Sequence, residues 1–268
     1  MPVAGSRILI TGASRGIGAA LARELAARGA RLALVARDEG ALRSLADELG
    51  TEARSATTYP ADLTATDAIA DLVAAVEADG PIDVLVNNAG VDLTGRFWEL
   101  PADSIAHLIT LNLTAPMLLC RAAIPGMLRH GRGHIVNVSS LAGTNTLPGV
   151  VPYGASKAGL SHFTAGLRAE LKGTPVTTTL AQIGPVESEM MVSLRSYGPT
   201  RRAVARLETL KLAVDVPMAT VVAALADAIE HRHRHVVLPK RDLAFPKLVE
   251  APRRMTEWLL TGVDHQHD

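Results

Sequence analysis

Residues 11–18 of this chain read TGASRGIG and join two segments of different character. The apolar residues Ile8, Leu9 and Ile10 come directly before them and are typical of a buried strand. The alanine-rich residues 19–28 follow with the spacing of an amphipathic helix. A strand, a glycine-rich turn and a helix in this order predict a cradle for the phosphates of a nucleotide.

Three glycines give this turn its predicted chemistry. Gly12 allows the tight turn, Gly16 lets the backbone approach a pyrophosphate, and Gly18 lets the helix pack closely on the strand. The unpaired N–H groups and the positive dipole end of the helix would then face the phosphates. Loops collect glycines for many reasons, so this prediction depends on the rest of the chain.

Length and composition favour one large α/β domain over residues 1–268. Hydrophobic residues make up 48% and charged residues 20%, which is enough apolar material for a substantial core. Lysine plus arginine equals aspartate plus glutamate, with 27 of each. The charge balance therefore gives no sign of a nucleic-acid partner or an anionic membrane partner.

The single cysteine, Cys120, lies in an apolar stretch and is interpreted as a small core residue. A lone thiol cannot form an internal disulfide, which is consistent with a reducing cytoplasm. No apolar run is expected to approach the roughly 18 residues of a membrane-spanning helix, and no leader segment is visible. We therefore expect a cytoplasmic protein without a membrane span.

Strand-like and helix-like segments alternate with short connections along the chain. This alternation predicts a Rossmann-type, doubly wound α/β fold, with a seven-stranded parallel sheet and helices on both faces. The expected strands are residues 7–11, 31–36, 53–59, 84–87, 133–139, 176–182 and 235–238. The expected helices are residues 16–28, 41–49, 65–78, 103–129 with interruptions near Pro116 and Pro125, 153–171 and 220–231.

Two segments break the alternation. Residues 189–217 are mostly helical in pattern, with a break at Gly198 and Pro199, and we interpret them as a lid over the site. Residues 243–262 form a second helical extension with several large apolar side chains. This extension would cover the sheet edge, cover the pocket or pack against a partner subunit.

Polar residues gather at the predicted carboxyl ends of strands, where open α/β sheets bind ligands. They include Asp62, the NNAG run at residues 87–90, and the pair Ser139 and Ser140. Tyr153 and Lys157 are four residues apart on the next predicted helix and share one of its faces. A lysine ammonium beside a phenol would lower the pKa of the phenol from about 10 and prepare it for acid/base chemistry.

With these residues the chain resembles the short-chain dehydrogenase/reductase family, in its compact single-domain branch. The resemblance extends from Arg7 to about Leu238 and includes TGASRGIG at residues 11–18, NNAG at 87–90 and YGASK at 153–157. Ser140 precedes Tyr153 by thirteen residues, and Asn112 precedes Ser140 by 28, which are intervals of the family's catalytic tetrad. Singly these residues would be packing or capping groups; their joint spacing favours the catalytic interpretation.

The resemblance implies a role for each of the four residues. Tyr153 would exchange the proton of a carbonyl/alcohol pair, and Lys157 would bind the nicotinamide ribose and lower the pKa of Tyr153. Ser140 would hold the substrate oxygen, in preference to its neighbour Ser139, and Asn112 would support a water chain from Lys157. The implied activity is hydride transfer between a nicotinamide cofactor and a ketone, aldehyde or alcohol.

The resemblance also implies a cofactor site. Its residues, besides Tyr153 and Lys157, are Gly12, Ser14, Arg15, Gly16, Ile17, Gly18, Arg37, Asp62, Leu63, Asn88, Ala89, Gly90, Gly184, Val186 and Ser188. The sequence departs from the family pattern after the sixth strand. Ile183 replaces a usual proline, and Ser188 keeps a hydroxyl where threonine is usual, so this loop would be less rigid.

The residues after the second strand predict NADP(H) as the cofactor. Enzymes that bind NAD usually place an acid at the end of this strand, to accept a hydrogen bond from the ribose 2′-OH. Here that position is Ala36, followed by Arg37, and Arg15 lies in the glycine loop. Two guanidinium groups suit a 2′-phosphate. Asp38 is the counter-argument, but we expect it to cap the following helix.

The substrate is expected to be a small carbonyl or alcohol compound, and the mainly apolar pocket wall favours a lipophilic one. By family position the wall would consist of Asp92, Leu93, Thr94, Ala142, Gly143, Val150, Met190, Met191 and Leu194. The resemblance implies a homodimer or homotetramer. The alternative to an enzyme is a non-catalytic NADP-binding regulatory protein of the same fold, which would typically lack Tyr153 or Lys157. The glycine spacing and the short C-terminal part disfavour a dehydratase or epimerase of the extended branch.

One histidine-rich run remains outside these functions. Residues 231–235 read HRHRH and could suit a metal ion or nucleic acid. Next to the apolar residues 236–238 we interpret the run as a solvated helix end that leads into a strand, and we expect no metal site. The tail, residues 265–268, is expected to be disordered.

Overall fold

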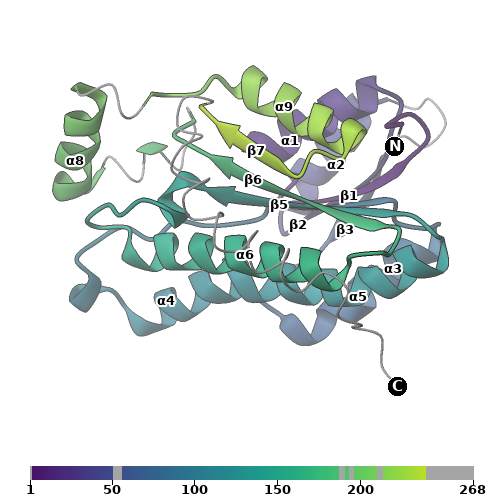
Figure 1. The fold of residues 1–268 in the computed structure, drawn as a ribbon, viewed down its shortest axis with the longest axis horizontal. Helices are drawn as coiled ribbons and strands as arrows, with labels where there is room; N and C mark the ends of the chain where they lie inside the picture. The colour runs from purple at the N-terminus through teal and green to yellow at the C-terminus, as the bar shows by residue number, and fades with distance from the viewer. Residues whose placement is uncertain (1, 51–55, 187–190, 193–195, 210–213, 240–268) are drawn as a thin grey trace.

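The computed structural model of the chain describes residues 2–50, 56–186, 191–192, 196–209 and 214–239 (Figure 1). Its centre is one parallel sheet with the strand order β3-β2-β1-β4-β5-β6-β7. The strands are β1 (Arg7–Thr11), β2 (Arg31–Ala36), β3 (Ala56–Pro60), β4 (Val84–Asn87), β5 (Gly133–Ser140), β6 (Val176–Ile183) and β7 (His235–Leu238). The predicted seven-stranded, Rossmann-type parallel sheet is therefore confirmed.

The order of the strands creates the binding position. The chain starts at β1 in the middle of the sheet, builds outward to β3, and then returns to place β4 on the other side of β1. The connections after β1 and β4 consequently leave the sheet toward opposite faces. In open parallel sheets, ligands bind in the crevice that forms at the carboxyl ends of such strands.

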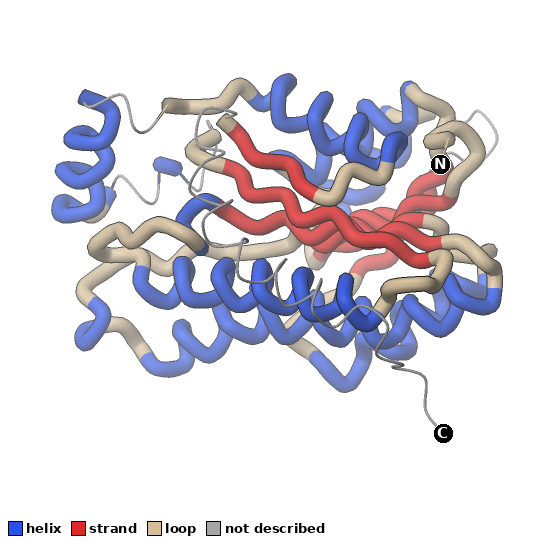
Figure 2. Tube along the Cα trace, in the orientation of Figure 1, coloured by secondary structure: helices blue, strands red, loops and turns tan. Residues whose placement is uncertain are grey.

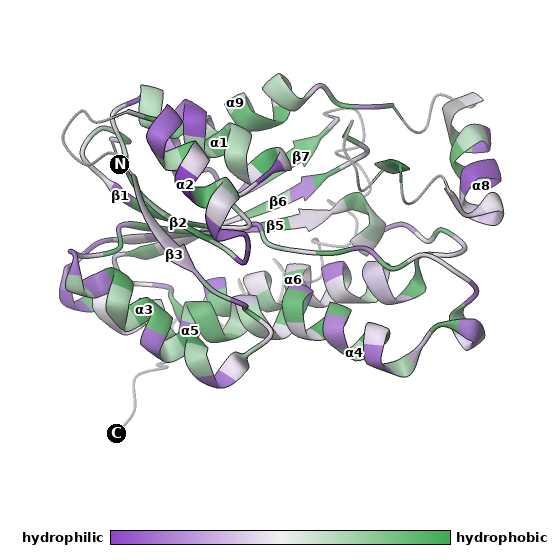
Figure 3. Cartoon of the chain, turned by 180° about the vertical axis from the view of Figure 1, so that it is seen from behind, coloured by the Kyte–Doolittle hydropathy of each residue, from purple (hydrophilic) through white to green (hydrophobic). Residues whose placement is uncertain are grey.

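Helices cover both faces of the sheet (Figure 2). One layer consists of α1 (Gly16–Ala27), α2 (Glu39–Glu48) and α9 (Met218–His231). The other consists of α3 (Ile69–Ala78), α4 (Ala102–Ile109), α5 (Ala115–Arg129) and α6 (Val151–Glu170). Figure 3 shows hydrophilic residues on the outer sides of α1, α2 and α3, which is the amphipathic pattern of helices that pack on a sheet.

Alternate strand residues supply the two cores. Ile8 and Ile10 of β1 pack with the α1, α2 and α9 layer, whereas Leu9 packs with the α3 and α5 layer. All five residues of β1 are buried, as expected for a central parallel strand that is covered on both faces. Cys120 lies in the second core, where burial raises the pKa of its thiol to about 12, so it is a packing residue as predicted.

The long helix predicted over residues 103–129 is interrupted near Pro116, as predicted, but not near Pro125. A π-helical turn, η3 (Thr110–Thr114), separates α4 from α5. Pro116 lies in the first turn of α5, where a missing N–H costs little. Pro125 lies inside α5 without ending it, so the interruption predicted there is wrong. Burial of the flanking Ala123 and Met127 in the core holds the helix together across this proline.

The described stretch Ala102–Arg129 is long and apolar enough to cross a membrane, a test that buried core helices also pass. In this fold one side of the stretch packs on the sheet, with Leu119, Ala123 and Met127 fully buried. The core uses only part of this apolar composition, since 39% of the most apolar window of the stretch is buried.

Other element boundaries differ from expectation in smaller ways. The helix predicted over residues 65–78 begins as a 3-10 turn, η1 (Thr66–Ala68), before α3. Two further 3-10 turns are η2 (Phe97–Glu99) and η4 (Leu141–Gly143). In the predicted lid, the break expected at Gly198 and Pro199 is confirmed, since the chain bends at Tyr197 and helix α8 (Gly198–Thr209) begins there. Residues 243–262 and the tail lie outside the described residues.

Candidate active site

The glycine loop joins β1 to α1 with almost no free space at two of its glycines. Gly12 has φ +65°, and a Cβ atom there would lie 2.8 Å from the Cα atom of Ala89. A Cβ atom at Gly18 would lie 2.2 Å from the carbonyl oxygen of Gly12. Gly18 thus lets the helix approach the loop itself, rather than only the strand. Gly16 is different, because nothing lies within 4 Å of its Cβ position.

Thr11 and Asn88 fasten this loop to the end of β4, a function that the sequence analysis did not assign to Thr11. The Thr11 hydroxyl donates to the Val86 carbonyl at 3.2 Å and accepts the N–H groups of Asn88 and Ala89 at 3.0 and 3.1 Å. The Asn88 amide donates to the carbonyls of Thr11 and Gly12 at 3.0 and 3.3 Å. A threonine directly before the first glycine was the available signal.

The N-terminus of α1 suits an anion. Its N-cap residue, Arg15, makes no side-chain capping hydrogen bond, and its first turn contains no acidic residue. The first N–H groups of the helix and its positive dipole end are therefore available to phosphate oxygens. Together with the open side of Gly16, this geometry fits the pyrophosphate of a dinucleotide.

At the end of β2, the two candidate ligands of the adenosine ribose, Asp38 and Arg37, have different surroundings. Asp38 is the N-cap of α2, and its Oδ1 accepts the N–H of Ala41 at 2.9 Å, as predicted. Arg37 is exposed and borders the same cavity as Arg15. Asp62 lies nearby, and hydrogen bonds from Thr64, with a smaller effect of the Arg37 charge, hold its pKa below the usual range.

Asn112 lies in the π-helical turn η3 and is fully buried. Its Oδ1 accepts the N–H of Val91 at 2.9 Å, and its Nδ2 donates to the Val91 carbonyl at 2.8 Å. Nδ2 also lies 3.2 Å from the hydroxyl of Ser156 on α6. Asn112 thereby ties the segment after β4 to α6, and π-helical turns of this kind often occur at functional sites.

The two serines at the end of β5 have different surroundings. The Ser139 hydroxyl is buried and bonds to the Lys157 carbonyl and the Ser161 hydroxyl, both at 2.9 Å. The Ser140 oxygen accepts the N–H of Ala142 at 3.1 Å and hydrogen-bonds the phenol of Tyr153. Of the two hydroxyls, the one on Ser140 contacts the candidate acid/base.

Burial governs the ionisation of Tyr153 and Lys157. It raises the pKa of Tyr153 to about 12, against a lowering effect of the Ser140 hydrogen bond, and the charge of Asp92 raises it further. Burial also lowers the pKa of Lys157 to about 8. Lys157 Nζ donates to the Val138 carbonyl at 3.0 Å and lies 5.8 Å from the centre of the Tyr153 ring. The expected lowering of the Tyr153 pKa by Lys157 is therefore absent from this structure, since burial dominates.

A cavity of about 1240 Å³ connects these groups. It is bordered by the glycine loop, Arg37, Asp62, the NNAG segment, Ser140, Tyr153, Lys157, Gly184 and Val186. Of the predicted site residues, Gly18 and Asn112 lie behind the cavity wall, and Ser188 lies outside the described residues. Ile183 extends β6 and is in register with Ser140 of β5 on one side and Leu238 of β7 on the other.

Only some of the residues predicted for the substrate side of the cavity border it. Asp92, Ala142, Val150 and Met191 border it, whereas Leu93, Thr94 and Gly143 do not, and Met190 and Leu194 lie outside the described residues. Wall residues that the sequence analysis missed are Leu111, Asn145, Leu147, Thr200, Val204, Leu207 and Met218. Helix α8 is held at this wall by a hydrogen bond from Thr200 to the carbonyl of Pro148 at 2.8 Å.

Comparisons with known proteins agree with this geometry. The family model of the short chain dehydrogenases matches residues 6–197. A ketoacyl reductase of Nostoc sp. is 36% identical over 212 residues, which are 78% of this chain and 74% of that protein. A solved metagenomic short-chain oxidoreductase in complex with NADP is 33% identical, with a TM-score of 0.73 over 89% of this chain and 97% of that one.

A second solved structure is similar over its whole length. A short chain dehydrogenase/reductase of Burkholderia phymatum, in complex with NAD, is 26% identical, with a TM-score of 0.80 and coverage of 100% for both chains. The residues that the family model matches include the glycine loop and all four residues of the candidate tetrad. The chain therefore belongs to the short-chain dehydrogenase/reductase family and is a nicotinamide-dependent oxidoreductase that acts on a CH–OH or C=O group.

Proposed function

We propose that this protein is an NADP(H)-dependent carbonyl reductase or alcohol dehydrogenase in which Tyr153 is the acid/base. The observation that carries the proposal is one cavity bordered by the glycine loop, Ser140, Tyr153 and Lys157. The cofactor supplies the hydride when it is bound, and the protein supplies alignment and proton transfer. The substrate class is a small ketone, aldehyde or alcohol.

The proton chemistry follows from the positions of three side chains. In the reductive direction, Tyr153 donates its phenolic proton to the carbonyl oxygen as that oxygen gains charge. Ser140, which hydrogen-bonds the same phenol, donates a hydrogen bond to the substrate oxygen. Lys157, whose Nζ lies 5.8 Å from the centre of the Tyr153 ring, would hydrogen-bond the nicotinamide ribose of a bound cofactor. The oxidative direction reverses each proton transfer.

The remaining residues hold the cofactor in place. The glycine loop and the uncapped start of α1 would hold the pyrophosphate, while Asn88, Ala89 and Gly90 would contact the ribose side. Arg15 and Arg37 would bind a 2′-phosphate through charged hydrogen bonds. The capping bond of Asp38 supports this assignment, because it engages the acid that could otherwise accept from a ribose 2′-OH.

The cofactor assignment can be tested by measuring the ratio of kcat/KM for NADPH to that for NADH. We expect wild type to prefer NADPH, and Arg37→Ala to lower that preference by at least tenfold, chiefly through the KM for NADPH. Arg43→Ala is the matched control, because Arg43 is an exposed arginine of α2 that pairs with Glu39. A preference for NADH in wild type would overturn the assignment.

The catalytic role is tested separately with Tyr153→Phe and a panel of ketones and alcohols. We expect the phenylalanine variant to bind NADPH normally, as judged by cofactor fluorescence, and to lose turnover by at least a hundredfold. Undiminished turnover in this variant would contradict the mechanism. Binding of NADPH by wild type without turnover of any compound in a broad panel would favour the regulatory alternative.

A further inference from the structure

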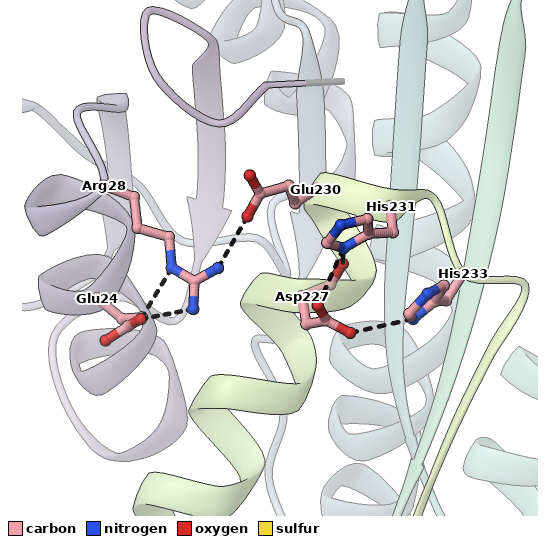
Figure 4. A network of polar contacts seen from close by, with 6 residues as sticks. All are labelled: Glu24, Arg28, Asp227, Glu230, His231 and His233. Atoms are coloured by element: carbon pink, nitrogen blue, oxygen red, sulfur yellow. Dashed lines mark hydrogen bonds and ion pairs between the residues drawn. The ribbon is translucent and has the colours of Figure 1, made fainter.

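The C-terminal end of α9 brings three potential metal ligands together (Figure 4). Asp227 and His231 are four residues apart and lie on the same face of the helix. The helix then ends at Arg232, which adopts the left-handed conformation with φ 55° and ψ 43°. This turn reverses the chain, so that His233 faces the same carboxylate. All three side chains are exposed.

The three side chains lie close enough together to form a small coordination site. His231 Nδ1 lies 2.9 Å from Asp227 Oδ1, and His233 Nδ1 lies 3.4 Å from Asp227 Oδ2. One ligand atom from each residue can be chosen so that all three lie within 4.8 Å of one another. In a tetrahedral zinc site with bonds of about 2.0–2.2 Å, ligand atoms are about 3.3–3.6 Å apart. Small rotations of exposed side chains would reach that spacing.

The two imidazole rings lie against each other. Their centroids are 5.6 Å apart and their planes differ by 22°, so the rings stack beside the carboxylate. The pair is therefore partly arranged before any ion binds, which reduces the entropy lost on coordination. His235, the other described histidine of the HRHRH run, is turned to Arg234, whose Nε lies 3.3 Å from its ring.

The charges around these three side chains also favour the binding of a cation. The last carbonyl groups of α9 place the negative end of the helix dipole at this position. The nearest helix, α1, contributes Arg28, but this guanidinium pairs with Glu24 at 2.7 Å and Glu230 at 3.0 Å (Figure 4). The charge of the half-buried Arg232 acts on His134 inside the sheet, where it helps to lower the pKa of the imidazole.

We propose that Asp227, His231 and His233 form a binding site for a divalent transition metal ion of the zinc type, with water as the remaining ligand. Two imidazoles and one carboxylate suit Zn²⁺ or Co²⁺, whereas Mg²⁺ and Ca²⁺ prefer oxygen ligands alone. The site lies at the amino end of β7, away from the carboxyl ends that border the cavity. Its function is structural, since the ion would fasten α9 to the turn that enters β7.

This proposal is independent of the proposed function and replaces our interpretation of the HRHRH run as a solvated helix end. The sequence placed the histidines two residues apart, a spacing that on a continuous helix would point them to different sides. Only the left-handed turn at Arg232 brings them to one carboxylate.

The test uses the full-length protein after removal of metal with a chelator. Titration with Zn²⁺ at neutral pH, followed by calorimetry, is expected to give one ion per chain. His231→Ala and His233→Ala should each weaken binding at least tenfold. The matched controls are His235→Ala and the double variant His265→Ala with His267→Ala in the tail, which should bind as wild type does. Co²⁺ should give visible absorption bands of a low-coordinate site that disappear in His233→Ala.

A thermal measurement separates a built site from casual binding by surface histidines. Saturating Zn²⁺ should raise the unfolding temperature of wild type but not that of His233→Ala, because an ion that binds only the native state stabilises it. Equal unfolding temperatures of the metal-free proteins would show that the variant still folds. Unchanged affinity in the two single variants, or loss of binding only in the tail variant, would overturn the proposal.

Discussion

The Asn112 side chain forms two hydrogen bonds with the main chain of one residue, Val91, at 2.9 and 2.8 Å. The two bonds resemble those between paired residues of neighbouring β-strands. They hold the segment after β4 against the π-helical turn. Gly90 is part of the same arrangement, because a Cβ atom there would lie 3.1 Å from Asn112 Oδ1 and 3.6 Å from Lys157 Nζ. The buried amide of Asn112 thus lies between the segment proposed to hold the cofactor and the side chains proposed to transfer the proton.

Replacing Asn112 with alanine should therefore affect both folding and activity. The change leaves the N–H and carbonyl of Val91 without this partner, and we expect the free energy of unfolding to fall by about 1–3 kcal/mol. Turnover should fall as well, since the segment that precedes Asp92 loses its anchor. Urea unfolding and steady-state kinetics would measure the two effects. Ser156→Ala removes the third contact of Asn112 and the 2.7 Å bond from the Ser156 hydroxyl to the Tyr153 carbonyl, but it leaves both bonds to Val91 in place and should cost less. An equal cost would contradict this assignment.

Gly16 and Gly18 should respond differently to alanine. At Gly18 the new Cβ would meet the Gly12 carbonyl oxygen at 2.2 Å, so Gly18→Ala should lower both stability and NADPH affinity. At Gly16 the Cβ would meet nothing within 4 Å, and the φ of +56° costs only about 1 kcal/mol for alanine. Gly16→Ala should therefore stay folded and lose mainly cofactor affinity. Thermal unfolding and NADPH fluorescence would measure this, and normal affinity in Gly16→Ala would argue against a pyrophosphate at the loop.

Asp92 should shift the pH range of catalysis, in addition to the larger effect of burial. Its charge raises the pKa of Tyr153, in the same direction as burial. Asp92→Asn removes that charge, so the phenol should ionise at lower pH. Alcohol oxidation, which needs the phenolate, should then begin at lower pH, and carbonyl reduction, which needs the protonated phenol, should be lost at lower pH. The pH profile of kcat/KM would measure the shift. Asp92→Glu retains the charge and should move the profile less; identical profiles for Asp92→Asn and wild type would refute the effect.

His134 should make stability fall in mild acid. The ring lies fully buried in β5, with Nδ1 2.8 Å from Thr177 Oγ1 and Nε2 2.9 Å from Thr179 Oγ1. Burial, with a smaller effect of the Arg232 charge, lowers its pKa to about 3. Below about pH 6.5 the unfolded chain binds a proton that the folded chain does not, so the free energy of unfolding falls as pH drops from about 6.5 toward 3.

His134→Gln provides the comparison for this prediction. Glutamine keeps a donor and an acceptor but does not titrate, so the difference between the two proteins isolates the histidine from the carboxylates. Urea unfolding at several pH values should show wild type losing up to about 1.4 kcal/mol more per pH unit than the variant below pH 6. Parallel pH dependences of the two proteins would rule out a titrating role for His134.

The sequence predicted the sheet better than the helices. The bounds of β1, β2, β4 and β7 agree to the residue, because each is an apolar run with a glycine or polar residue beside it. Helix boundaries depend on packing that no local pattern contains. The π-helical turn at Asn112 arises where α4 and α5 meet α6, and Pro125 is tolerated because its neighbours are buried.

The sequence likewise predicted one part of the candidate site and could not predict another. The spacing of Ser140, Tyr153 and Lys157 was sufficient to expect them around one cavity, since the carboxyl ends of parallel strands meet at one edge of the sheet. The sequence could not give the pKa of Tyr153, because ionisation depends on burial and on how far Lys157 Nζ lies from the ring. It also could not give the apolar wall from α8, which comes from residues distant in the chain.

The residues around TGASRGIG determined a strand, a glycine-rich turn and a helix, because glycine permits backbone positions that other residues do not adopt cheaply. The sequence as a whole was sufficient to predict the fold and the family. Only the tertiary structure decided which groups meet across elements: Thr11 with the end of β4, Asn112 with Val91, and two histidines with Asp227. Such contacts depend on directions of side chains and turns that are set after the whole core has packed.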